Sequence, residues 1–285
     1  MVEHKKINKS NVTVIIPCYN DGQYIVEALQ SLYKQTLLPE KIIIVDDGSN
    51  IDTKKIVRTI NHPLVQIVYQ ENKGVSAARN LAISIAETDY IANLDADDYY
   101  APTFIEKAVR QLNQNKEIKA VSSYCRIFQK TKTIEIVKPL GGKLRDFIVI
   151  NNSRASAVFR KNSWESVGGF DEAMREGYED WEFWIAVLKK GGEIHILQEV
   201  LSHYRIKAVS RDQNALQKHD FELRQYIYLK HKELYHEHLD FYIGELLRQN
   251  SLLRNSVHKA KKSIDYSLGR FILKPFRSLK KIMKF

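Results

Sequence analysis

The chain has 285 residues, of which 44% are hydrophobic, which is enough for one large domain or for a domain with an appendage. Much of its formal net charge of +10 comes from the far C-terminus, so we do not expect a uniformly basic surface. Cys18 and Cys125 lie in apolar segments and are expected to be reduced core residues of a cytosolic protein, and neither a membrane span nor a signal peptide is predicted.

Apolar, β-branched runs alternate with helical patterns over the first hundred residues. Strands are predicted at residues 12–16, 41–45, 65–69 and 90–94, and a helix is predicted between each strand and the next. Alternation of this kind indicates a parallel sheet that helices cover on both faces. In such sheets, ligands bind beyond the carboxyl ends of the strands.

Polar or acidic loops follow all four strands, namely Pro17–Asn20, Asp46–Asn50, Asn72–Gly74 and Asp95–Asp98. Asp95 and Asp97 are two residues apart, so on an extended backbone both side chains point the same way. Mg²⁺ or Mn²⁺ would relieve the repulsion between the two carboxylates and would also bind substrate phosphates. The alternative is that these aspartates are turn and capping residues, a role expected of Asp98 before the helix near Pro102.

The elements that follow have weaker patterns. A helix is predicted over residues 102–115, a strand over 120–124 and a hairpin within 126–139. A short strand at 156–159, a helix beginning near Gly177 and a strand at 193–197 complete the α/β part. From about Gln213 glycine nearly vanishes while charged residues, tyrosines and leucines dominate, which predicts two or three helices.

Six motifs, in this order and spacing, resemble the signature series of family 2 glycosyltransferases. They occupy residues 14–20, 44–50, 72–80, 93–98, 168–171 and 179–181. The resemblance covers roughly residues 11–212. It implies the GT-A fold of nucleotide-diphospho-sugar transferases, a Rossmann-like and mostly parallel α/β sheet, here followed by a helical C-terminal appendage.

The resemblance implies a nucleotide-sugar donor held by several of these motifs. Asp95-Ala96-Asp97 matches the Asp-x-Asp element, whose last aspartate coordinates a metal on the donor diphosphate and whose first contacts the ribose or uridine side. Asp47 matches the aspartate that hydrogen-bonds the donor base, and Asp46 precedes it. The remaining donor residues implied in this way are Pro17, Tyr19, Asn20 and Arg79. For Arg79 a structural ion pair is the alternative.

Asp180 matches the catalytic base of the family. Inverting transfer needs a carboxylate that takes the proton from the acceptor hydroxyl, although a carboxylate at a helix start is also an ordinary cap. The flanking Glu179 and Trp181 match the family pattern and are candidate acceptor contacts. His203 and Arg205 resemble a less constant element that closes over the donor phosphates, and His203 is alternatively a core histidine.

The C-terminal tail, residues 266–285, has the pattern of a basic amphipathic helix. Its apolar residues from Leu268 to Met283 fall near one helical face, and every charged side chain from Leu268 onward is basic. Such a helix suits an anionic membrane surface, although packing on the protein itself or on a dimer partner is the alternative. Pro275 is expected to kink or divide it.

We therefore predict three parts: a GT-A domain (11–212), a helical appendage (213–265) and a membrane-surface tail (266–285). The expected reaction is metal-dependent, inverting transfer of a single hexose-type sugar from a UDP-sugar to a glycan or lipid-linked glycan, in surface-polysaccharide assembly. The expected location is cytoplasmic, on the inner face of the plasma membrane. A nucleotidyltransferase and a nucleic-acid-binding protein are the alternatives, although acidic loops repel nucleic-acid phosphate unless metal is present.

Overall fold

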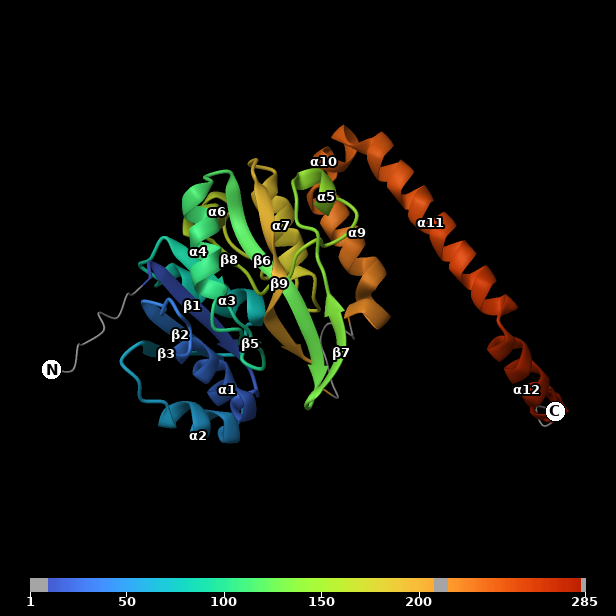
Figure 1. The fold of residues 1–285 in the computed structure, drawn as a ribbon, viewed down its shortest axis with the longest axis horizontal. Helices are drawn as coiled ribbons and strands as arrows, with labels where there is room; N and C mark the ends of the chain where they lie inside the picture. The colour runs from blue at the N-terminus through green and yellow to red at the C-terminus, as the bar shows by residue number, and fades with distance from the viewer. Residues whose placement is uncertain (1–9, 208–214, 283–285) are drawn as a thin grey trace. The chain divides into compact units, whose positions relative to one another are not determined.

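The computed structural model describes residues 10–207 and 215–282, with side chains up to residue 273 (Figure 1). The chain forms two compact units, one ending at His231 and the other beginning at Lys232. The predicted boundary after residue 212 lies within the undescribed segment 208–214. The division into three parts therefore stays a prediction.

The first unit is built on a nine-stranded sheet of order β3-β2-β1-β4-β8-β6-β9-β5, with β7 paired to β6. The first four strands pair in parallel, as the alternating pattern predicted: β1 Val12–Cys18, β2 Lys41–Asp47, β3 Val65–Gln70 and β4 Tyr90–Asn93. β1 and β2 are buried on both faces, which explains their continuous apolar runs. Their carboxyl ends meet at one edge of the sheet.

The other half of the sheet mixes parallel and antiparallel pairs. Its strands are β5 Tyr99–Tyr100, β6 Ile118–Gln129, β7 Lys132–Val137, β8 Val158–Arg160 and β9 Glu193–Arg205. β6 and β7 form the predicted hairpin. β9 runs eight residues beyond its predicted end at Leu197. The register between β6 and β9 shifts at Tyr124, opposite this point of β9. Such a shift interrupts the alternation of apolar and polar residues from which the end of the strand was predicted. The extension carries β9 to the loop Asp95–Asp98, which we call the acidic loop.

Helices cover both faces of the sheet (Figure 1). Val14 and Ile16 of β1 belong to one buried cluster with residues of α1 (Gly22–Tyr33) and α4 (Phe104–Gln114). Ile15, equally buried, points to the opposite face, and α3 (Val75–Ser84) packs on β1 there. The helix α2 (Ile51–Thr59) packs on α1 and is capped by Asn50, whose side chain accepts the Thr53 N–H at 2.9 Å.

An aromatic cluster packs α7 (Glu179–Leu188) against the sheet. Phe159 of β8 contacts Phe183 and Trp184 of α7, and Phe170 stacks on Phe183 with ring centroids 4.1 Å apart. Phe170 belongs to the Gly-Gly-Phe-Asp motif that follows α6 (Lys161–Val167). The cluster fixes the start of α7, where the predicted base lies.

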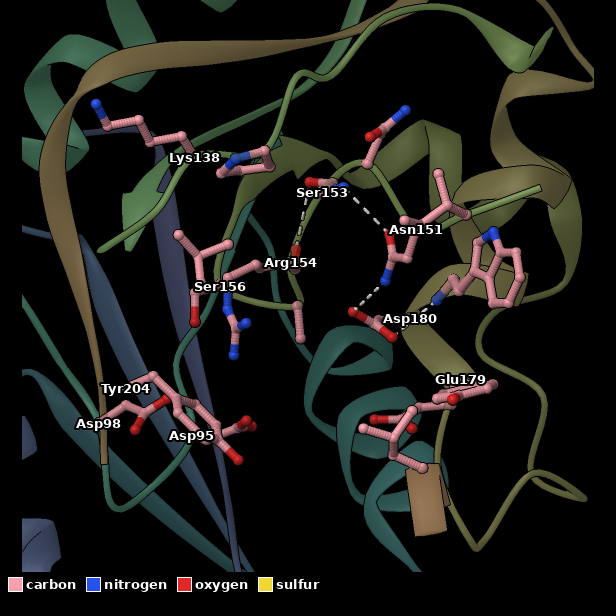
Figure 2. A pocket seen from close by; sticks show the side chains of 18 of the residues that line it. Asp95, Asp98, Lys138, Asn151, Ser153, Arg154, Ser156, Glu179, Asp180 and Tyr204 are labelled. Atoms are coloured by element: carbon pink, nitrogen blue, oxygen red, sulfur yellow. Dashed lines mark hydrogen bonds between the residues drawn. The ribbon is translucent and has the colours of Figure 1, made fainter. Parts of the chain in front are cut away.

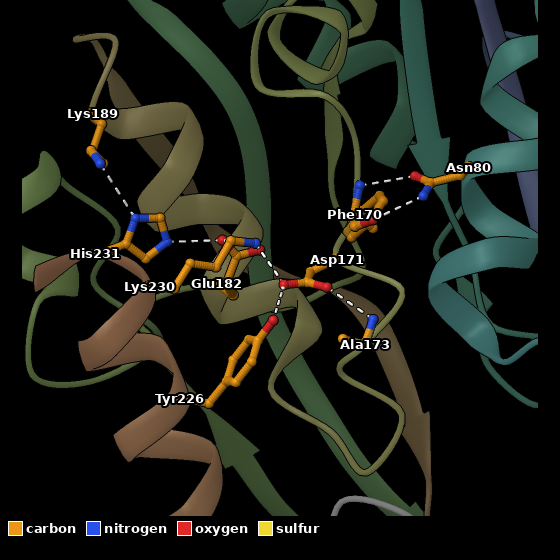
Figure 3. Close-up of polar contacts among 9 residues, drawn as sticks. All are labelled: Asn80, Phe170, Asp171, Ala173, Glu182, Lys189, Tyr226, Lys230 and His231. Carbon is orange, nitrogen blue, oxygen red and sulfur yellow. Dashed lines mark hydrogen bonds and ion pairs between the residues drawn. The ribbon is translucent and has the colours of Figure 1, made fainter.

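The helix α9 (Asp220–Lys230) follows a π-helical turn, η1 (Ala215–His219), and is fastened to α7 by a buried polar network (Figure 3). Glu182 on α7 accepts hydrogen bonds from His231 Nε2 at 2.8 Å and from Lys230 Nζ at 2.9 Å. Lys230 also reaches Asp171 at 2.6 Å, and the Tyr226 hydroxyl donates to that carboxylate.

Asp171, the last residue of the Gly-Gly-Phe-Asp motif, is thereby held by α9. Burial alone would raise the pKa of Asp171, but hydrogen bonds from Lys230, the Ala173 N–H and Tyr226 lower that pKa below its ordinary value. The carboxylate therefore stays charged and keeps α9 in place beside α7.

The second unit consists of α10 (Lys232–Glu237), α11 (Leu239–Lys262) and α12 (Ile264–Ile282). The helix α12 continues through Pro275, so of the two expected effects of this proline, a kink or a division, the structure excludes the division. Among the described residues, no helix combines the length and the apolar character needed to cross a membrane.

We predict that Glu182→Gln lowers the free energy of unfolding by about 2 kcal/mol, because His231 and Lys230 lose a charged acceptor in a buried setting. Urea denaturation of the whole chain measures the effect. Glu222→Gln on the exposed face of α9 is the control and should leave stability unchanged. Equal stability of the two variants would contradict a role for this network.

Candidate active site

A cavity of about 500 Å³ lies at the carboxyl ends of β1, β2 and β4. Six of the predicted donor or metal residues line it, namely Pro17, Tyr19, Asp47, Asp95, Ala96 and Asp97. Asn72 and Gly74 of the third loop complete one wall. The structure thus brings together the four loops that the sequence placed at one edge of the sheet.

Asn20 and Asp46 are not part of this lining. The Asn20 N–H donates to Ser49 Oγ at 3.0 Å, and its side chain accepts the Asn50 N–H at 2.7 Å, so Asn20 ties the first loop to the second. Asp46 is fully buried and accepts the Ser49 N–H at 2.9 Å. Both residues shape the loops that carry Tyr19 and Asp47.

Asp47 connects the second loop to the third. Its carboxylate accepts the Lys73 N–H at 2.8 Å, the Gly74 N–H at 2.9 Å and the Gln70 side chain at 2.6 Å. Gly74 has φ +94°, a conformation that suits glycine, and it is the N-cap of α3. These hydrogen bonds from Asp47 therefore stabilise the conformation of the third loop.

Each of the three clustered aspartates has its own partner in the protein. Asp95 accepts from Arg79 at 2.9 Å, Asp97 from Lys207 at 2.8 Å, and buried Asp98 from the backbone N–H of Arg205 at 2.9 Å. The N-cap of α4 is Thr103, so the expectation that Asp98 caps this helix is wrong. Burial and the charges of its two neighbours raise the pKa of Asp98 well above its ordinary value.

Arg79 is fully buried and joins three elements. Its guanidinium donates to Asn93 at the end of β4 at 3.0 Å, to Asp95 at 2.9 Å and to Glu179 on α7 at 2.7 Å. Burial lowers the pKa of the guanidinium, but the charges of Asp95 and Glu179 outweigh it and raise that pKa. Arg79 and Glu179 therefore form the structural ion pair that was the alternative for this arginine.

The carboxylates of Asp97 and Asp21 converge on one cation in this cavity. Lys207 Nζ lies 2.8 Å from Asp97 Oδ2 and 2.8 and 3.0 Å from the two oxygens of Asp21. Two carboxylates with substrate phosphates are a typical ligand set for Mg²⁺ or Mn²⁺. In the described ranges no group of three or more His, Cys, Asp or Glu side chains is placed to hold a metal ion.

A second cavity of about 460 Å³ contains Asp180 (Figure 2). Asp180 Oδ2 accepts the Asn151 side-chain amide at 3.0 Å, and Oδ1 accepts the Trp181 N–H at 2.8 Å. Glu179 and Trp181 line the same cavity, and the Trp181 indole donates to the Phe147 carbonyl at 2.7 Å. The three residues of the predicted acceptor motif therefore lie together, with the carboxylate of Asp180 held from two sides.

A strained turn presents this motif. Tyr178, the N-cap of α7, has φ +61°, which is uncommon for a residue with a side chain, and Gly177 before it has φ +134°. A Cβ on Gly177 would lie 2.7 Å from the Cβ of Ala215, so no other residue fits without movement. The Tyr178 hydroxyl donates to Asp220 on α9 at 2.6 Å and so holds the turn.

The helix α9 also forms part of the cavity wall. Arg224 lies over the Trp181 ring at 5.0 Å and donates to the Val149 carbonyl at 3.2 Å. The wall opposite Asp180 comes from the segment Ile150–Ser156 (Figure 2). The size and shape of this cavity therefore depend on a helix that sequence reasoning assigned to the appendage.

His203 and Arg205 line neither cavity. His203 stacks on Tyr99 with ring centroids 4.3 Å apart, and burial lowers its pKa to about 4, so the ring is neutral. Arg205 donates to the Asp97 carbonyl at 2.9 Å and pairs with Glu27. Arg205 therefore stabilises the backbone of the acidic loop without lining the cavity.

Sequence reasoning did not assign every residue that lines these cavities. Among those that it missed are Asp21, Asn151, Tyr204 and Lys207. Asp21 directly follows the first motif, and Tyr204 and Lys207 lie within two residues of Arg205. Their closeness to the predicted site residues could have identified them from the sequence. Asn151 lies in a segment that has neither a motif nor a regular hydrophobic pattern, so the sequence did not indicate it.

Asp95 and Tyr204 line both cavities, so the two spaces adjoin. One contains the ends of the four loops and the cluster of Asp21, Asp97 and Lys207, and the other contains the carboxylate of Asp180, which two hydrogen bonds hold in place.

Comparison with known proteins identifies the class. A sequence model of glycosyl transferase family 2 matches residues 13–171. The chain therefore belongs to this family. TarS 1-349 of S. aureus in complex with UDP-GlcNAc has a similar structure, with a TM-score of 0.61, 20% identity and coverage of 72% of this chain and 61% of that one. This likeness confirms the predicted GT-A fold.

Two curated relatives are polysaccharide synthases. Chondroitin synthase of Escherichia coli is 28% identical over 192 residues, which are 65% of this chain and 27% of the synthase. Hyaluronan synthase of Pasteurella multocida is 26% identical over 212 residues, 68% of this chain and 20% of the synthase. The chain thus matches about a quarter or less of the length of these two relatives.

We predict that Arg79→Met lowers the free energy of unfolding by about 3 kcal/mol, because the buried carboxylate of Glu179 loses the guanidinium that pairs with it. Chemical denaturation measures the change. The matched control, Arg58→Met, removes an exposed arginine of α2 and should have little effect. A fully stable Arg79→Met variant would show that the pair is dispensable.

Proposed function

We propose that the chain transfers one sugar from a UDP-sugar to a hydroxyl of a glycan or lipid-linked glycan, with inversion at the anomeric carbon and with Mg²⁺ or Mn²⁺. The 500 Å³ cavity takes the donor and the 460 Å³ cavity takes the acceptor. The observation that carries this proposal is the shared wall at Asp95, which lets a sugar on the donor face a hydroxyl beside Asp180.

In this proposal Asp180 is the catalytic base. Its carboxylate accepts the proton of the acceptor hydroxyl as that oxygen forms a bond to the anomeric carbon and the bond to the nucleoside diphosphate breaks. The Asn151 amide and the Trp181 N–H fix the carboxylate, which favours one orientation toward the acceptor. A single displacement inverts the carbon without a protein nucleophile.

The donor side uses the first cavity. Tyr19 is half exposed beside Asp47, which suits stacking and hydrogen bonding of a nucleobase. Asp97, with Asp21, would hold the divalent ion. That ion would offset the charge that develops on the departing diphosphate. Structures of TarS with UDP and with UDP-GlcNAc support the choice of uridine nucleotide.

We also propose a role in surface-polysaccharide assembly at the cytoplasmic face of a membrane. The relatives named chondroitin and hyaluronan synthase support a polysaccharide product. The helix α12 supports a membrane surface, since its apolar side chains Ile264, Leu268, Phe271 and Ile272 are all exposed.

Calorimetric titration of UDP with and without Mn²⁺ tests the donor assignment. We expect UDP to bind at least about tenfold more tightly with Mn²⁺, and we expect Asp97→Asn to remove that gain, because the ion loses a protein ligand. UDP binding to Asp97→Asn that still responds fully to Mn²⁺ would refute the metal assignment. Tighter binding of GDP or dTDP would refute the choice of nucleotide.

Asp180→Asn tests the second cavity. We expect turnover with the preferred UDP-sugar to fall about 10³-fold, because the amide cannot accept the proton. UDP affinity should remain at the wild-type value, since Asp180 is not part of the donor cavity. Full activity of this variant would exclude Asp180 as the base.

Truncation after Ser267 tests the tail. We expect the shortened protein to lose binding to anionic vesicles at low salt, because the truncation removes the exposed apolar residues from Leu268 onward and the basic side chains. Vesicle sedimentation of both proteins measures this. Equal sedimentation of the full-length and shortened chains would refute membrane binding through the tail.

A further inference from the structure

Lys207 lies where a divalent cation would be needed. Its ammonium contacts both oxygens of Asp21 and one oxygen of Asp97, all within 3.0 Å, inside the donor cavity. The three side chains are 28%, 18% and 13% exposed, so water screens these interactions only in part. The ammonium of Lys207 therefore lies between the carboxylates of Asp21 and Asp97, which are the two groups that would bind a metal ion.

The ammonium of Lys207 lies against two carboxylates, an arrangement that favours its positive charge. Two carboxylates and one ammonium leave a net charge of −1. Adding a divalent ion at Asp97 places it against this ammonium, and like charges at such a distance repel strongly outside bulk water.

We propose that Lys207 is a built-in counter-ion of the metal position: it weakens metal binding in the donor-free enzyme and moves onto the diphosphate when the nucleotide and the metal bind. This inference rests on the proposed donor site. The nucleotide makes the exchange favourable, because its diphosphate supplies negative oxygens for the ammonium as well as ligands for the ion.

The proposal has a thermodynamic consequence. If Lys207 opposes the metal only while no diphosphate is present, UDP must strengthen Mn²⁺ binding, and Mn²⁺ must strengthen UDP binding by the same factor. Lys207 then supplies part of this coupling. Removing its charge should strengthen metal binding without nucleotide and reduce the factor by which UDP improves it.

The test is Mn²⁺ binding followed by the electron paramagnetic resonance signal of free Mn²⁺, with and without UDP. In Lys207→Met without UDP we expect affinity to rise at least about tenfold, with a corresponding drop in the UDP coupling factor. Lys207→Gln is the second variant. Lys107→Met is the matched control, because it removes a lysine that pairs with Glu199 outside the donor cavity, and it should bind Mn²⁺ as wild type does.

The double variant Asp97→Asn with Lys207→Met identifies the site, since the gain must disappear when Asp97 is changed. Unchanged or weaker Mn²⁺ affinity in both folded Lys207 variants would overturn the proposal. Metal-independent UDP binding that is lost in Lys207→Met would also overturn it, because Lys207 would then replace the metal. Failure of the donor assignment shows separately, as absent UDP binding in every variant.

Discussion

The buried guanidinium of Arg79 is the interaction on which the rest of the site depends. It connects α3 to the end of β4 through Asn93 and Asp95, and to the start of α7 through Glu179. These elements are far apart in the sequence, and each ends in residues that line a cavity. Because a buried charge needs all its partners, this one side chain helps to fix the relative position of the two cavities.

The acidic loop shows how three carboxylates coexist at one edge of a sheet. Asp95, Asp97 and Asp98 are each matched by a different group, namely a guanidinium, an ammonium and a backbone N–H. Only the ammonium of Lys207 sits on a flexible stem inside a cavity. The site therefore combines a half held by the buried Arg79 with a half in which, under our proposal, Lys207 gives way to a metal ion.

Sequence reasoning found the parallel half of the sheet because buried strands and their polar loops repeat in a regular way. The motifs single out Asp95, Asp97 and Asp180, and the structure has all three in the walls of the cavities. Sequence reasoning did not find Lys207, because its contact with Asp21 spans 186 residues and no local pattern indicates it. Asn151 was equally hidden, since its contact with Asp180 spans 29 residues and depends on packing that no local pattern encodes.

The helix α9 has a consequence for dissecting the protein. Sequence composition suggests a cut near residue 212, yet α9 and His231 lie beyond it and belong to the first compact unit. A fragment ending there would lose Asp220, Arg224, Lys230 and His231, leave the buried carboxylate of Glu182 without Lys230 and His231, and open one wall of the second cavity. An expression fragment that keeps this wall intact therefore has to extend at least to His231.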